Sequence, residues 1–231
     1  MDPSFYYLAA AAGYGEARMA ALSNNLANVN TPGFKADQMQ FSEVLDAATG
    51  TVSLSADQYI DFAPGNVETT GNPLDLAIEG DGFFVVDTPD GQRFTRDGGF
   101  TLGPGSVLQT SSGHPVLGGS GPVTVDPAAV NINITQDGNV IVDGQLVNTI
   151  QVVSFPEGTK PIKAGGNLFF AEGSQPATET VITQGALERS NVQSVTEMAR
   201  MIEVTRGYEA YVKVIQAMDA TAAQTTEVGT V

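Results

Sequence analysis

Residues 23–35 read SNNLANVNTPGFK, and this stretch decides how the first element of the chain ends. Asparagine is unfavourable inside a helix. At a helix end, however, its side chain can hydrogen-bond the carbonyl groups left without partners and the backbone of a turn. Pro32 and Gly33 then prevent the helix from continuing. We therefore expect one long helix that ends near Asn30 and is followed by a tight turn.

The residues before this turn repeat apolar side chains in steps of four and three, which is the pattern of one helix face. Pro3 suits the first turn of a helix. A helix from Pro3 to Asn30 would be roughly 40 Å long at about 1.5 Å per residue. Its predicted stripe consists of Leu8, Ala12, Gly15, Met19, Leu22, Leu26 and Val29.

A similar stripe near the C-terminus predicts a second long helix. This stripe consists of Met198, Met201, Thr205, Tyr208, Val212 and Ile215, and a neighbouring apolar face carries Ile202, Val204, Tyr211 and Met218. A helix with two apolar faces needs more than one partner, either another chain or the protein's own β-rich region. We expect the two terminal helices to pair with each other, antiparallel, like a coiled coil.

Short apolar runs separated by glycine-rich turns fill the middle of the chain and predict β-strands. Residues 83–86 form one run, and residues 92–96 return after Pro89-Asp90-Gly91, where proline fixes φ and glycine accepts a positive φ. The predicted fold is therefore α+β, with long N- and C-terminal helices that pair as a coiled-coil-like domain and an inserted, mainly antiparallel β domain. The expected segments are 1–35 (helix and turn), 36–72 (extended linker arm), 73–186 (β-rich domain) and 187–231 (C-terminal helix).

The charge and composition exclude several classes of function. A formal net charge of −16 argues against nucleic acid and against anionic membrane surfaces, because both need clustered Lys and Arg. The absence of cysteine excludes disulfides, thiolate metal ligands and cysteine nucleophiles. No stretch reaches the roughly 18 apolar residues of a membrane span. Residues 5–12 are apolar, but Asp2 precedes them and the first basic residue is Arg18, so we expect no cleaved signal peptide.

The sequence offers no catalytic, cofactor-binding or metal-binding constellation. A catalytic triad would have to use His114, the only histidine, which lies in a turn-like segment, and a two-histidine metal site is impossible. Asp137-Gly138 and Asp143-Gly144 lack the alternating acidic ligands of a calcium loop and indicate hairpin turns. Residues 80–82 lack the third glycine of a dinucleotide site. We expect no catalytic residue, cofactor, metal or small-molecule substrate.

Residues 23–35 resemble the signature of flagellar rod and hook proteins. The residues that carry this resemblance are Asn24, Asn25, Leu26, Asn28, Thr31, Gly33 and Phe34. Three further segments resemble the same family in the same order: LAIEGDGFFVV at residues 76–86, FTRDGGF at 94–100 and GALERSNV at 185–192. Within the family, residues 113–117 and 121–125 are similar to the proximal rod class, and the stretch between Phe41 and Asn66 is short. A distal rod protein or another flagellar axial protein is the alternative.

The resemblance implies a structural, non-enzymatic subunit that polymerises with itself and with other rod proteins into the axial drive shaft for bacterial motility. It also implies export by the flagellar type III apparatus, and a location in the basal-body rod where it crosses the periplasm. The terminal helices would line the tube and the β domain would form its outer layer. The residues expected at helix contacts in this assembly are Leu8, Ala12, Gly15, Met19, Leu22, Leu26, Met198, Met201, Ile202, Tyr208, Val212 and Ile215.

Two other classes of protein stay open as remote alternatives. A glycosidase that cleaves the cell wall needs two carboxylates about 5–10 Å apart in a cleft. Asp81, Asp90 and Asp97 are available, but each precedes a glycine as a turn residue would. A secreted adhesin or calcium-dependent binding module with helical stalks is the third class. A pull-down against rod proteins, a muramidase assay and a calcium titration would distinguish the three.

We predict that His114→Ala leaves swimming motility unchanged apart from a small effect on stability, because His114 is read as a turn residue without a catalytic or metal role. Motility in soft agar and export of the variant are the measurements. Loss of assembly by a variant that still folds and is still exported would contradict this reading.

Overall fold

The computed structural model describes residues 3–45, 52–126, 128–129, 131–156, 158–178 and 180–228. The chain divides into two compact units. Unit 1 consists of Met1–Val29, Ala36–Phe62 and Val192–Val231. Unit 2 consists of Asn30–Lys35 and Ala63–Asn191.

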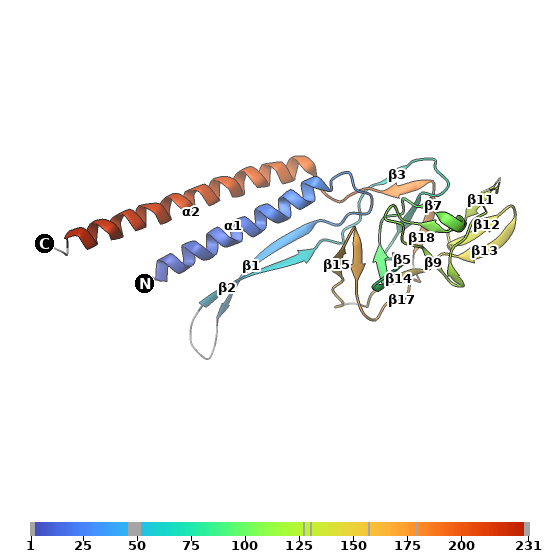
Figure 1. Cartoon of the computed structure of the whole chain (residues 1–231), viewed down its shortest axis with the longest axis horizontal. Coiled ribbons are helices and arrows are strands. Elements are labelled where there is room, and N and C mark those ends of the chain that lie inside the picture. The colour runs from blue at the N-terminus through green and yellow to red at the C-terminus, as the bar shows by residue number, and fades with distance from the viewer. Residues whose placement is uncertain are drawn as a thin grey trace. The chain divides into compact units, whose positions relative to one another are not determined.

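Unit 1 contains two long helices and a β-hairpin (Figure 1). The helices are α1 (Pro3–Ala27) and α2 (Ser194–Val228), and they lie side by side. The hairpin consists of β1 (Asp37–Leu45) and β2 (Val52–Ile60), paired antiparallel with Asp37 opposite Ile60. Strand β1 also contacts α1. The residues expected to form an extended arm therefore include a regular hairpin.

The fold-class prediction was wrong in its coiled-coil pairing. Across the described parts of α1 and α2, no continuous seam of interlocking side chains forms. Met198 of the predicted stripe and Ile202 of the neighbouring apolar face are 48% and 55% exposed. A cavity of about 400 Å³ opens between the helices near Gly15. The small residues Ala11, Gly15 and Gly207 line this cavity, and such residues cannot supply the large side chains that interlock in a coiled-coil seam.

Unit 2 is built on a six-stranded antiparallel sheet in the order β15-β16-β6-β5-β14-β17. Its strands are β5 (Phe83–Thr88), β6 (Gly91–Thr95), β14 (Val152–Ser154), β15 (Ile162–Gly165), β16 (Leu168–Phe170) and β17 (Gln175–Pro176). The predicted hairpin across Pro89-Asp90-Gly91 is present, because β5 and β6 pair with Phe84 opposite Thr95 and Thr88 opposite Gly91. Gly91 has a φ of 97°, as that turn requires.

Smaller antiparallel groups complete unit 2. A three-stranded sheet consists of β11 (Ile132–Ile134), β12 (Asn139–Val142) and β13 (Gln145–Thr149). The two-stranded pairs are β3 (Val67–Thr69) with β19 (Ala186–Glu188), β4 (Leu76–Glu79) with β18 (Val181–Gln184), β7 (Thr101–Leu102) with β8 (Leu108–Gln109), and β9 (Leu117–Gly118) with β10 (Gly121–Pro122). A short 3-10 helix, η1 (Pro104–Ser106), connects β7 and β8.

The two faces of the large sheet bury different sets of side chains. Phe84 and Val86 on β5 belong to the main apolar core, where the ring of Phe84 meets Phe100 edge-on at a centroid distance of 5.1 Å. Alternate residues of a strand face opposite sides, so Phe83 lies on the other face. There it contacts Phe155 and Phe169 at centroid distances of 5.2 and 5.7 Å. Both faces are therefore packed at the centre of the sheet.

Residues 97–99 form a turn after β6, and this turn is hydrogen-bonded to the start of β4. The side chain of Asp97 accepts a hydrogen bond from the Gly99 amide at 2.9 Å, and the Leu76 amide donates to the Gly98 carbonyl at 3.1 Å. Burial raises the pKa of the Asp97 carboxyl, the Gly99 amide opposes that rise, and the nearby charge of Asp75 adds to it. Ionised Asp97 therefore lowers the stability of the folded state.

We predict that Asp97→Asn raises the melting temperature at neutral pH, because an amide oxygen can still accept the Gly99 hydrogen bond without burying a charge. Since the folded-state pKa of Asp97 lies above its ordinary value, this carboxyl costs stability at pH values above that range. The gain from Asn should therefore shrink as the pH falls toward the ordinary carboxyl pKa. Thermal unfolding of both proteins between pH 4 and pH 8 measures it, and a gain that grows on acidification would contradict the assignment.

Candidate functional site

The candidate site is the signature stretch, whose residues divide between the two units. In unit 1, Asn25 is 1% exposed and its amide forms three hydrogen bonds. Its Oδ1 accepts from the Asp37 amide and its Nδ2 donates to the Asp37 carbonyl, both at 2.8 Å. Nδ2 also donates to the Glu197 carboxylate at 3.2 Å. One side chain therefore holds the end of α1 to the starts of β1 and α2.

The other asparagines of the signature have local roles. The Asn28 side chain donates to the Asn24 carbonyl at 2.9 Å, so it satisfies a carbonyl of the last helical turn, as expected for a helix end. Asn24 itself is exposed, whereas Leu26 is half-buried. Glu197, which receives Asn25, also accepts a hydrogen bond from Arg200 at 2.9 Å.

In unit 2, the signature continues as a loop over residues 30–35 that packs closely on the β domain. Gly33 has a φ of 65°, and a β-carbon at this position would lie 2.3 Å from the Arg96 carbonyl carbon. No other residue fits there without moving the backbone. The Gly33 amide donates to the Glu188 carbonyl at 2.7 Å, and the Thr31 carbonyl accepts from the Phe34 amide at 3.3 Å.

Phe34 is buried and lies against Lys163 of strand β15. The ammonium group of Lys163 lies 4.2 Å from the centroid of its ring, within the range of a cation–π contact. The Asn167 side chain donates to the Pro32 carbonyl at 2.8 Å. The signature loop is therefore fixed by one apolar side chain and by polar contacts on both sides of it.

The strongest interaction of the loop is a buried ion pair. Lys35 is 1% exposed and Glu188 2% exposed, and the Lys35 Nζ lies 2.7 Å from the Glu188 Oε1. Lys35 also donates to the Ala63 carbonyl at 2.9 Å, and Glu188 Oε1 also accepts from the Gly65 amide at 2.9 Å. A buried charge is tolerated only when such partners satisfy it.

Arg96 completes the arrangement on the other oxygen of the same carboxylate. Its Nη1 lies 3.4 Å from the Glu188 Oε2 and also donates to the Ile78 carbonyl, while Nη2 donates to the Gly80 carbonyl at 2.6 Å. The guanidinium lies 5.1 Å from the ring centroid of Phe83. Burial lowers the pKa of Arg96 and the Glu188 charge opposes that change. We call Lys35, Arg96 and Glu188 the Glu188 cluster.

The Glu188 cluster brings together all four segments that resembled the family. Lys35 comes from the signature, Gly80 and Ile78 from the segment at 76–86, Arg96 from 94–100 and Glu188 from 185–192. It also gathers the three stretches of unit 2 that continue along the chain into unit 1. The Asn191 amide donates to the Phe34 carbonyl and its side chain to the Ala63 carbonyl.

None of the three residues of the Glu188 cluster was predicted as a site residue, although each lies in or beside a family-like motif. Long charged side chains are seldom fully buried, so a charge inside a motif is usually read as solvated. The available signal was the position of each charge beside residues that demand close backbone packing: Gly33 before Lys35, and Gly98 and Gly99 after Arg96.

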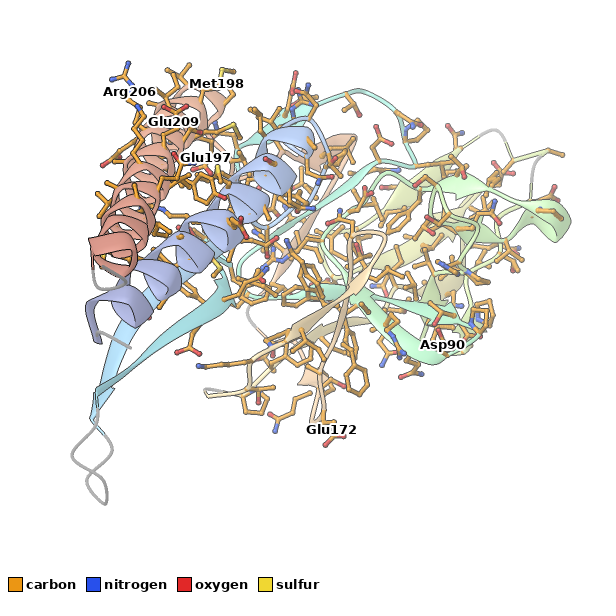
Figure 2. All side chains as sticks on the ribbon, turned by 60° about the vertical axis from the view of Figure 1, so that its left-hand side comes forward. Asp90, Glu172, Glu197, Met198, Arg206 and Glu209 are labelled. Atoms are coloured by element: carbon orange, nitrogen blue, oxygen red, sulfur yellow. The ribbon has the colours of Figure 1, made fainter. Side chains whose placement is uncertain are left out.

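The residues predicted at helix contacts lie at varied depths in unit 1. Leu22 and Gly15 are buried, and Leu8, Ala12, Met19, Leu26, Met201, Tyr208, Val212 and Ile215 are half-buried. Hydrogen bonds across the helices involve some of them: the Thr205 hydroxyl lies 3.7 Å from the Met19 sulfur, and Tyr208 donates to Glu16 at 2.9 Å. Figure 2 places Met198 and Arg206 along the outer margin of α2. Their role in subunit contacts stays a prediction.

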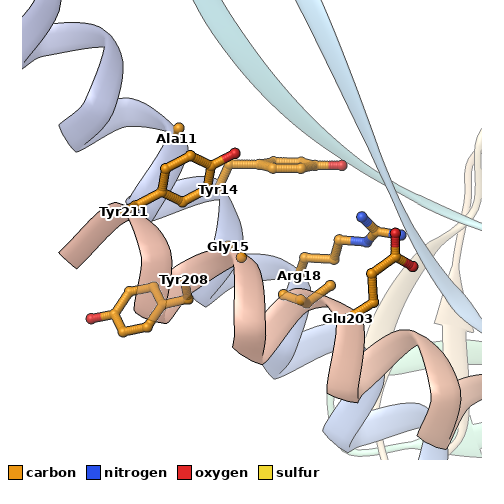
Figure 3. Close-up of a pocket in the computed structure, with 9 residues that line it drawn as sticks. Ala11, Tyr14, Gly15, Arg18, Glu203, Tyr208 and Tyr211 are labelled. Carbon is orange, nitrogen blue, oxygen red and sulfur yellow. The ribbon is translucent and has the colours of Figure 1, made fainter. Parts of the chain in front are cut away.

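Tyrosine and glycine residues line much of the cavity between α1 and α2, together with one basic and one acidic residue (Figure 3). Tyr14 and Tyr211 border it, with Arg18 and Glu203 at one end. A β-carbon on Gly15 would lie 3.7 Å from the Tyr208 ring, which is an ordinary contact distance. Gly15 is the one residue of the predicted α1 stripe in the described lining of the cavity, where it lies with the small residues Ala11 and Gly207.

The described residues contain no group of three or more histidine, cysteine or acidic side chains placed to hold a metal ion. Among them, no helix is long and apolar enough to cross a membrane. His114 lies in a turn in which its amide donates to the Thr110 hydroxyl and its carbonyl accepts from the Thr110 amide. The charges of the Glu188 cluster contact one another and backbone groups.

Three family models match the chain. The model described as "Flagella basal body rod protein" matches residues 16–35. The "Flagellar hook protein FlgE/F/G D1 domain" matches residues 77–142, and the "Flagellar basal body rod FlgEFG protein C-terminal" matches residues 183–228.

Individual relatives align over nearly the whole chain. The chain is 36% identical to the flagellar basal-body rod protein FlgF of Mesorhizobium japonicum over 90% of each protein, and 35% identical to FlgF of Salmonella typhimurium over 95% of each. It is 31% identical to the flagellar basal-body rod protein FlgG of Buchnera aphidicola subsp. Acyrthosiphon pisum, over 95% of this chain and 96% of the relative. These relatives confirm the predicted family resemblance, which within the family was to the proximal rod protein FlgF.

We predict that Glu188→Ala destabilises unit 2 by about 3–5 kcal/mol, the usual cost of leaving a buried charge without its partner. Here two buried cations, Lys35 and Arg96, would lose the carboxylate. Urea unfolding followed by circular dichroism measures the change. The matched control is Glu68→Gln, which removes an exposed ion pair with Arg189 and should cost under about 1 kcal/mol. Equal effects of the two substitutions would contradict a structural role for the cluster.

Proposed function

The chain belongs to the family of flagellar basal-body rod proteins, and on that premise we propose that it serves in the proximal part of the rod. It is a structural subunit of the basal-body rod. The observation that carries this conclusion is the alignment with FlgF over both ends and the middle of the chain.

The proximal assignment is supported by the pattern of identity. The FlgF relatives are 33–37% identical to this chain, whereas the FlgG relatives are 30–32% identical. Strands β1 and β2 overlap the stretch between Phe41 and Asn66, whose shortness indicated the proximal class together with residues 113–117 and 121–125.

A subunit of this kind works through its surfaces. We propose that it assembles with copies of itself and with other rod proteins where the rod crosses the periplasm, and that the flagellar type III apparatus exports it. The exposed apolar side chains of α2, Met198 and Ile202 among them, are proposed as contacts with neighbouring subunits. We propose that the protein is not an enzyme, since the buried charges are occupied by structural contacts.

A place in the distal rod is the second candidate. It is favoured by the FlgG relatives, which align with 88–95% of this chain. The two assignments differ in where the chain lies along the rod.

The test is to locate an epitope-tagged copy of this chain in purified basal bodies by electron microscopy, with an untagged strain as the control. We expect the label in the half of the rod nearer the inner membrane. Label along the outer half, up to the hook, would make the chain a distal rod protein. A chain missing from intact basal bodies would contradict the proposed function altogether.

A further inference from the structure

The charges of unit 2 are unevenly distributed along its sequence. No Lys or Arg occurs between Arg96 and Lys160, and this stretch carries the acidic residues Asp97, Asp126, Asp137, Asp143 and Glu157. The basic residues of unit 2 are Lys35, Arg93, Arg96, Lys160, Lys163 and Arg189. Residues 97–159 therefore carry only acidic charges, and the Lys and Arg side chains of unit 2 all lie outside this stretch.

A basic, apolar surface lies at the β15 edge of the large sheet. Ile162 and Phe170 are directly opposite each other on β15 and β16, and they are 60% and 37% exposed. The Arg93 guanidinium lies 5.0 Å from the ring centroid of Phe170, and Lys160 is an exposed residue two positions before Ile162. We call these four residues the basic patch.

The basic patch is the uncovered end of a face that is otherwise buried. Arg93 is paired with Val86, which is fully buried in the main core. The apolar core covers this face of the sheet at β5. Farther along the same face, Phe170 on β16 and Ile162 on β15 are not covered by it and are exposed. Neighbouring exposed apolar residues rimmed by charge are typical of a protein-binding surface.

An acidic, apolar surface lies on the three-stranded sheet. Leu146 pairs with Ile141 across β12 and β13, and Leu146 and Val147 are 64% and 44% exposed. Asp137 and Asp143 are exposed residues in the turns at the two ends of β12. We call Leu146, Val147, Asp137 and Asp143 the acidic patch. Figure 1 shows β15 at one end of unit 2 and β12 and β13 at the other.

We propose that the basic patch of one copy of this chain binds the acidic patch of the next copy. The two patches differ in charge and lie at opposite ends of unit 2, so the contact joins copies head to tail. Such a contact does not close on itself as a two-fold dimer does, and it therefore suits an open helical assembly. Opposite charges steer the encounter and fix its register, and the apolar side chains supply burial.

A second copy is the occupant that charge favours. The chain has a net charge of −16, so most of its surface repels another copy. The basic patch brings the cations Arg93 and Lys160 to this surface, and the acidic patch offers the matching sign on the same molecule. This inference rests on the proposed function, because the rod would bring copies of unit 2 next to one another.

The experiment uses disulfide cross-linking in purified basal bodies. Because the chain has no cysteine of its own, the introduced cysteines are the only ones in it that can cross-link. The double variant Ile162→Cys, Leu146→Cys should give oxidised multimers of this chain in a ladder. Each single variant should stay monomeric, since its cysteine would face a patch without one. Dimers from either single variant would indicate a two-fold contact and overturn the proposal.

The matched control is Ile162→Cys combined with Val181→Cys, which places the second cysteine at an exposed apolar position outside both patches. It should give no ladder. Lys160→Glu in the double-cysteine chain should lower the cross-linked fraction about tenfold, because like charges now face each other, and Asp137→Lys should restore it. Immunoblotting of the basal bodies distinguishes failure of the proposed function from failure of the proposed contact. A chain absent from basal bodies contradicts the proposed function, whereas a chain present without a ladder contradicts only this contact.

Discussion

The structure of unit 2 depends on one buried carboxylate. Glu188 is 2% exposed and holds Lys35 on one oxygen and Arg96 on the other. Removing these charges from water is costly, and well-placed partners offset that cost. The backbone groups of Ala63, Ile78, Gly80 and Gly65 supply further partners, and only the Arg96 Nε is left without one among the described atoms of the cluster. The cluster therefore dictates where four distant segments of the chain must lie.

This constraint explains why the family-like motifs have the residues they have. Gly33 is needed because the loop passes against the backbone of Arg96, and Phe34 is buried against Lys163 of β15. The chain passes between unit 1 and unit 2 at four points, 29–30, 35–36, 62–63 and 191–192. On the unit 2 side of three of these points, Lys35, Ala63 and Asn191 are joined by hydrogen bonds.

Part of this could be read from the sequence. The turn Pro89-Asp90-Gly91 predicted the β5–β6 hairpin because its chemistry is local. The β1–β2 hairpin was not predicted, since its polar strands gain stability from contact with α1. The coiled coil was predicted wrongly because periodicity alone does not reveal that small residues leave a cavity. The Glu188 cluster was missed because its members are 92 and 153 residues apart in sequence.

The central claim is that Lys35 and Glu188 act as one buried unit. A double-mutant cycle with Lys35→Met, Glu188→Gln and the combined variant measures their coupling by urea unfolding of the full chain. Residues in a shared buried network couple by about 0.5–3 kcal/mol, and this ion pair should lie near the upper end of that range. The combined variant should then be less destabilised than the sum of the single variants. Additivity within about 0.5 kcal/mol would contradict the account.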